Sequence, residues 1–134
     1  MIAEVGIVIL RGVPTDPAVV RFVAELIAPI QYGAPYGNIW DVLAVPDPNN
    51  AAFSDGGLDF HMDLSYYESP PGIQFLHCLR FDDCVTGGES MFVDAWHVAE
   101  TLRATYPDQF DTLTRVPATF QHVHIDRQYP LHMR

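Results

Sequence analysis

Basic residues, cysteines and long apolar runs are all scarce in this chain of 134 residues. Seven Lys and Arg stand against seventeen Asp and Glu, which gives a formal charge of −10. Phosphate backbones and anionic lipid surfaces repel a chain of this charge, so neither nucleic acid nor a membrane surface is expected as a partner. A cationic small molecule remains compatible with the acidic balance.

The two cysteines, Cys78 and Cys84, are too few for a disulfide framework, and Cys78 lies in an apolar run. The first residues, MIAEVGIVILRGVP, lack a basic region, and their apolar run is short. This pattern predicts a buried strand rather than a signal peptide or a membrane span. A reducing compartment, the cytoplasm, is therefore the expected location.

The composition is that of a folded chain, with 49% hydrophobic and 18% charged residues, and its length fits one domain. Asp16 and Pro17 predict the start of a helix that ends at Pro29. A second helix is predicted between Asp94, as its N-cap, and Pro107. A short turn containing Phe110 and Leu113 should follow it.

Alternating and apolar stretches predict three strands, FHMDL, GIQFLHCLRF and ESMFVD, with turns between them. The last stretch, ATFQHVHIDRQYPLHMR, also begins like a strand. The order of strand, helix, loop, several strands, helix and strand predicts a mixed α+β, β-centred fold.

His61 and Asp63 stand two residues apart in the stretch DFHMDLSYYESPPG. On a strand these two side chains share one face, while Phe60, Met62 and Leu64 share the other. An imidazole and a carboxylate on one face are two corners of the two-His-one-carboxylate triad that binds non-heme Fe(II). The alternative is a half-buried histidine that is hydrogen-bonded to its neighbouring carboxylate.

Spacing alone does not decide between these alternatives, because a second His-x-Asp occurs at His124. Three longer blocks give the context: YGNIW from Tyr36, HMDLSYYESPPGIQFLHCL from His61 and GGESMFVDAWHVAETL from Gly87. In this order and spacing they resemble the γ-butyrobetaine dioxygenase and trimethyllysine dioxygenase branch of the taurine dioxygenase-like (TauD/TfdA) superfamily. The resemblance runs from about Gly6 to the C-terminus.

This resemblance implies a partial double-stranded β-helix, jelly-roll-like, with flanking helices. Residues 1–134 would be the N-terminal half of one catalytic domain, with no separate second domain. The implied chemistry uses Fe(II), 2-oxoglutarate and O₂ to hydroxylate an unactivated C–H bond. His61 and Asp63 correspond to the first two iron ligands, and Ser90 to the residue whose hydroxyl contacts 2-oxoglutarate. A plain turn serine is the alternative for Ser90.

The implied substrate is a small trimethylammonium carboxylate. A quaternary ammonium group cannot donate a hydrogen bond, so proteins hold it against aromatic faces. Tyr36 and Trp40 correspond to the cage aromatics of the family, and Phe53 stands where the family often has tyrosine. Asn50 matches a position that is Asn in butyrobetaine enzymes, which favours γ-butyrobetaine and carnitine biosynthesis. The alternative is that these four residues only pack a loop.

The remaining histidines receive no catalytic role. His77 shares a strand face with apolar residues and is expected to be a satisfied core histidine. His97 is expected in the surface or packing of a helix. The C-terminal group is interpreted as incidental: His122, His124, His132 and Asp126.

The second histidine ligand of the family, and the arginine that pairs with 2-oxoglutarate, lie downstream of the matched blocks, and this chain stops at Arg134. We therefore expect the chain alone to have little or no activity, and its exposed strand edges to favour self-association. A homodimer is one arrangement that could supply the missing groups. Two alternatives remain: trimethyllysine dioxygenase or another TauD-family dioxygenase, and a non-catalytic binding fragment that keeps the cage without iron chemistry.

Overall fold

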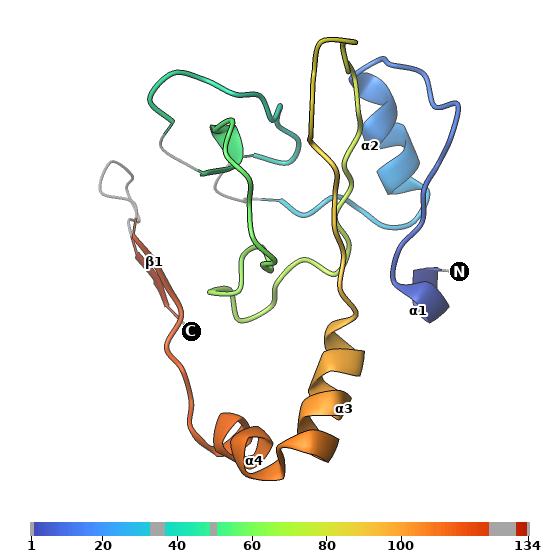
Figure 1. Ribbon diagram of the computed structural model, residues 1–134. Helices are drawn as coiled ribbons and strands as arrows, with labels where there is room; N and C mark the ends of the chain where they lie inside the picture. The colour runs from blue at the N-terminus through green and yellow to red at the C-terminus, as the bar shows by residue number, and fades with distance from the viewer. Residues whose placement is uncertain (1, 33–36, 49–50, 124–130, 134) are drawn as a thin grey trace. The chain divides into compact units, whose positions relative to one another are not determined.

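The computed structural model describes residues 2–32, 37–48, 51–123 and 131–133 (Figure 1). The chain divides into two compact units, one made of residues 1–59 and 71–89, the other of residues 60–70 and 90–134. Among the described residues, the first unit carries two helices and a 3-10 turn, and the second carries two helices and a pair of antiparallel strands. One incomplete catalytic domain over residues 1–134 stays a prediction.

The N-terminal residues form a short helix, α1 (Ile2–Val5), where a strand was predicted. The backbone N–H of Gly6 donates to the carbonyl of Ile2 at 2.9 Å. Gly6 has a φ of 79°, a left-handed conformation that glycine adopts without steric cost and that commonly ends a helix. The predicted strand is wrong here because the local helical hydrogen bond needs no partner strand.

Helix α2 (Ala18–Glu25) confirms the helix predicted after Asp16. The Asp16 carboxylate accepts a hydrogen bond from the N–H of Ala18 at 2.9 Å, which satisfies one of the free donors of the first turn. The helix ends at Glu25, before the proline that was expected to end it. Among the described residues, Ala24 on this helix is the one buried hydrophobic side chain.

The three predicted internal strands have no ladder partner within the described residues, and none of them is a strand. A turn joins the second and third of these segments, where the N–H of Val85 donates to the carbonyl of Asp82 at 3.0 Å. Strands need hydrogen bonds from distant parts of the chain, whereas a turn needs only neighbours. The jelly-roll-like, β-centred fold class stays a prediction.

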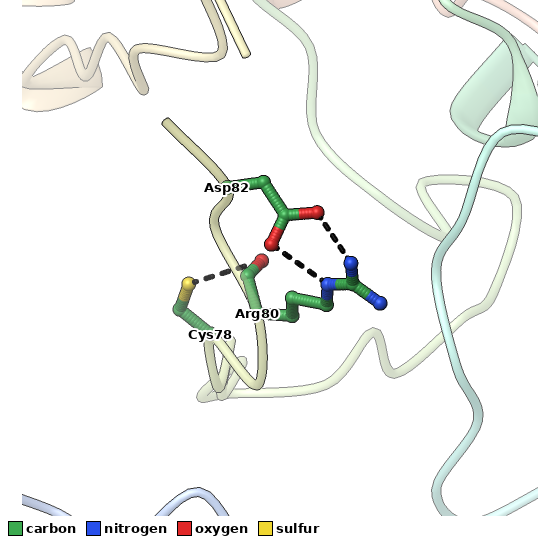
Figure 2. A network of polar contacts seen from close by, with 3 residues as sticks. All are labelled: Cys78, Arg80 and Asp82. Atoms are coloured by element: carbon green, nitrogen blue, oxygen red, sulfur yellow. Dashed lines mark hydrogen bonds and ion pairs between the residues drawn. The ribbon is translucent and has the colours of Figure 1, made fainter. Parts of the chain in front are cut away.

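Arg80 and Asp82 form a two-pronged ion pair just before this turn (Figure 2). Arg80 Nε lies 2.8 Å from Asp82 Oδ1, and Arg80 Nη2 lies 2.6 Å from Asp82 Oδ2. Hydrogen bonding to Asp82 raises the pKa of the Arg80 guanidinium above its usual value.

Cys78 contacts the carbonyl of Arg80 through its Sγ at 3.8 Å. Both cysteines are free and exposed, so Cys78 is not a buried apolar residue.

The second unit contains the predicted helix α3 (Ala95–Thr105), followed at once by α4 (Pro107–Arg115), and the two helices contact each other (Figure 1). Asp94 caps α3 as expected, with its Oδ1 accepting from the N–H of His97 at 3.1 Å. The predicted short turn around Phe110 is wrong, because Pro107 starts a new helix instead of only ending the previous one.

The chain then forms a hairpin of β1 (Gln121–Val123) and β2 (Leu131–Met133), which confirms the strand expected at the start of the last segment. The strands are antiparallel, with His122 opposite His132 in the register. Within the described residues, no helix is both long enough and apolar enough to cross a membrane.

Candidate metal and substrate site

His61 and Asp63 lie in contact, with His61 Nε2 at 3.5 Å from Asp63 Oδ1. Their side chains are 53% and 52% exposed, so solvent or a bound ion can reach both donor atoms. An imidazole nitrogen and a carboxylate oxygen this close can bind the same divalent cation. The same contact also fits the alternative of a histidine paired with its neighbouring carboxylate.

A tight turn follows this His61–Asp63 pair. Leu64 has a φ of 54°, a left-handed conformation that is rare for residues with a side chain. The N–H of Tyr67 donates to the carbonyl of Leu64 at 2.9 Å and closes the turn. The predicted strand therefore does not extend through Leu64, although His61 and Asp63 still face one another as the strand pattern predicted.

Ser90 is exposed and comes after two glycines with the same left-handed backbone. Gly87 and Gly88 both have a φ of 82°, and a Cβ on Gly88 would lie 3.7 Å from the Phe81 ring. The turn before Ser90 thus needs glycine mainly because of its left-handed backbone, and less because a side chain would lack room. The contact of Ser90 with 2-oxoglutarate stays a prediction.

Two of the four predicted cage residues lie in the described part of the first unit. Trp40 is 41% exposed. Phe53 ends the 3-10 turn η1 (Ala51–Phe53), and its carbonyl accepts from the N–H of Val45 at 2.9 Å. An open hollow beside this turn is lined by Ala44, Val45, Pro46, Asp47, Pro48, Ser54 and Asp55. Tyr36 and Asn50 lie outside the described residues.

His77 differs from its sequence-based interpretation. Both of its ring nitrogens are buried, and neither has a hydrogen-bond partner among the described residues. The expectation that the polar atoms of His77 are satisfied is therefore wrong for the described residues. A buried polar atom without a partner costs stability.

His122, which was given no role, stacks on Tyr66. Their ring centroids lie 4.6 Å apart and their planes differ by 7°. Tyr66 also meets Tyr67 edge-on at 5.1 Å. No sequence spacing could have indicated this contact, because it joins the turn after Asp63 to strand β1, far along the chain. His124 and Asp126 lie outside the described residues.

No group of three His, Cys, Asp or Glu side chains that could hold a metal ion occurs within residues 2–32, 37–48, 51–123 and 131–133. If His61 and Asp63 bind a metal, they provide two of the three protein ligands of the triad in this part of the chain. The donor types of the pair, one imidazole and one carboxylate, still fit two of the three positions of the Fe(II) triad.

Comparison with known proteins gives one family over nearly the whole sequence. Residues 1–133 match the family described as Taurine catabolism dioxygenase TauD, TfdA family. The chain is 41% identical to dioxygenase str8 of Strobilurus tenacellus, over 88% of this chain and 28% of that protein. It is 38% identical to gamma-butyrobetaine dioxygenase of Pseudomonas sp. (strain AK-1), over 90% of this chain and 30% of that protein.

A trimethyllysine dioxygenase of Meyerozyma guilliermondii is 33% identical, over 84% of this chain and 27% of that protein. The chain thus spans less than a third of the length of these curated relatives. No solved structure gives a significant match. The family that the three sequence blocks predicted is confirmed, and the chain belongs to the TauD, TfdA family of dioxygenases.

Proposed function

We propose that this chain forms the iron- and substrate-binding part of an Fe(II)/2-oxoglutarate-dependent dioxygenase that hydroxylates a small trimethylammonium carboxylate. The contact of 3.5 Å between His61 Nε2 and Asp63 Oδ1 carries this proposal, together with the family membership. Relatives named as gamma-butyrobetaine and trimethyllysine dioxygenases support the substrate class. γ-Butyrobetaine is the first choice because of Asn50, and trimethyllysine is the second.

His61 and Asp63 would hold the iron, whose bound form supplies the activation of O₂ in this chemistry. Both side chains are about half exposed, which leaves room around the ion for a co-substrate. The hydroxyl of Ser90 would donate a hydrogen bond to a carboxylate of 2-oxoglutarate. Its exposure after the left-handed Gly87 and Gly88 keeps that hydroxyl accessible.

Trp40 and Phe53 would face the trimethylammonium group, with Tyr36 and Asn50 completing the substrate site. Asp47 and Asp55 in the hollow beside Phe53 add negative charge, which favours a cation over a neutral or anionic ligand. This combination of aromatic rings and acidic groups supports a quaternary ammonium substrate.

The same proposal includes an incomplete metal site. Two protein ligands hold iron weakly, and the described residues show no group of three. A third ligand and an arginine for 2-oxoglutarate would be supplied by a further segment or by a second copy of the chain. We propose that this chain alone turns over little or no substrate. The jelly-roll-like fold would belong to the completed domain, and the protein would act in the cytoplasm. The competing function is a binding fragment that keeps the aromatic cage without iron chemistry.

Tryptophan fluorescence tests the substrate site directly, because the sequence has only Trp40 and Trp96. Trp96 is 84% exposed on α3, so a Trp96→Phe variant leaves Trp40 as the reporter at little structural cost. Titration with γ-butyrobetaine should change the emission of Trp40. The neutral isostere with carbon in place of the quaternary nitrogen should bind about two- to thirtyfold more weakly, because it lacks the cation–π attraction.

Calorimetry on Trp40→Leu, with Trp96→Phe as the matched control, completes the test. Loss of binding in the Trp40 variant alone supports the proposal. Equal affinity for the cation and its neutral isostere, or unchanged binding in Trp40→Leu, would contradict it. Trimethyllysine in the same titration decides between the two substrates.

A further inference from the structure

The turn that carries the His61–Asp63 pair has an unfavourable backbone. Leu64 follows Asp63 directly and adopts a φ of 54°, a conformation that residues with a side chain usually avoid. One hydrogen bond, from the N–H of Tyr67 to the carbonyl of Leu64, closes this turn. Such a conformation persists only where surrounding contacts fix it.

The contact that can fix it comes from the other end of the second unit. Tyr66 is one of the two central residues of the turn. Its ring stacks on the His122 imidazole, with centroids 4.6 Å apart and planes 7° apart. Tyr67 adds an edge-on contact to Tyr66 at 5.1 Å. Tyr66, Tyr67 and His122 are all half-buried, whereas His61 and Asp63 are exposed. Packing therefore acts on the turn that follows the pair.

We propose that the Tyr66–His122 stack positions the His61–Asp63 pair for metal binding, which makes Tyr66 and His122 positioning residues. The inference rests on the proposed function, because it assumes that His61 and Asp63 bind a divalent ion. His122 itself lies in β1, where the hairpin with β2 supports it. The stack thus ties the turn after the pair to the most C-terminal strands that the structure describes.

A metal titration tests this inference, with Mn(II) as the probe and the electron paramagnetic resonance signal of free Mn(II) as the readout. We expect His122→Ala to weaken Mn(II) binding about threefold to tenfold, which is the range of a lost aromatic contact. His122→Phe should restore binding, because a phenyl ring keeps the stack. His97→Ala, an exposed histidine in α3, is the matched control and should change nothing.

A double mutant separates positioning from direct ligation. If His122 acts through the pair, His122→Ala should have no further effect in a His61→Ala background. If His122 were itself a ligand, the loss would persist there, and phenylalanine would fail to restore binding. Either of those results would overturn the inference.

Amide hydrogen exchange gives a readout that needs no metal. The Tyr67 amide should exchange about threefold to tenfold faster in His122→Ala than in the unaltered chain, and His122→Phe should slow it again. Unchanged exchange at Tyr67 would overturn the inference. Mn(II) binding that is lost in His61→Ala but unaffected in His122→Ala would overturn this inference alone, whereas Mn(II) binding unaffected by His61→Ala would also overturn the proposed metal site.

Discussion

The backbone between His61 and Asp63 brings their side chains together, and packing acts on the turn that follows them. Both side chains are about half exposed, and their contact of 3.5 Å spans a single intervening residue. The spacing in the sequence was sufficient to predict this proximity, because any extended backbone puts alternate side chains on one side. The left-handed Leu64 could not be predicted in the same way, since nothing in its chemistry favours that conformation.

His77 gives a test at the scale of one residue. Its two ring nitrogens are buried without a partner among the described residues, and each such atom costs about 1–3 kcal/mol. His77→Leu should therefore raise the free energy of unfolding by about 1 kcal/mol or more, measured by chemical denaturation. His97→Leu, at an exposed position, should change it by less than about 0.5 kcal/mol.

A lower stability in His77→Leu would contradict this account. It would mean that the imidazole donates or accepts a hydrogen bond which the described residues do not include. Sequence reasoning predicted a satisfied histidine, whereas the lack of a polar partner among the described residues depends on contacts that a single sequence does not specify.

The helices and the strands differ in how far the sequence predicted them. Asp16, Asp94 and Pro107 act within one turn of their own positions, so α2 and α3 were predictable from local signals. Pro107 was recognised as an end of α3 but not as the start of α4. The three internal segments have the strand pattern without a ladder, because a ladder depends on partners that the pattern itself cannot supply.

The cap of α3 gives a test at the scale of one element. Asp94→Ala removes the acceptor for the N–H of His97 and should lower the free energy of unfolding by about 0.5–2 kcal/mol. The helical signal in circular dichroism should fall as the first turn frays. Asp94→Asn keeps an acceptor oxygen at the same place and should retain most of the stability.

Equal losses in the alanine and asparagine variants would contradict the capping role. They would instead indicate that the negative charge at the start of the helix matters more than the hydrogen bond.

At the scale of the whole molecule, many large apolar side chains stay exposed. Leu76 is 70% exposed, Met91 69% and Trp96 84%, and Ala24 is the one buried hydrophobic residue among those described. The chain also spans less than a third of its curated relatives. Both observations support the proposal that further polypeptide covers these side chains and completes the iron site.

The family could be predicted from the sequence because three ordered blocks carry it, and the match over residues 1–133 confirms it. The roles of Ser90, Trp40 and Phe53 stay predictions, because each depends on groups that meet only around bound ligands. The roles of Tyr36 and Asn50 also stay predictions, because these two positions lie outside the described residues.

The most direct test of the proposed iron site is the visible charge-transfer absorption that forms when Fe(II) and 2-oxoglutarate bind together. The measurement is made anaerobically, with Fe(II) and 2-oxoglutarate in excess over the chain, because two protein ligands hold iron weakly. We expect a band in the unaltered chain and in His97→Ala, and its loss in both His61→Ala and Asp63→Ala. Absence of the band in the unaltered chain, or a band that survives His61→Ala, would contradict the assignment of His61 and Asp63 as the iron ligands.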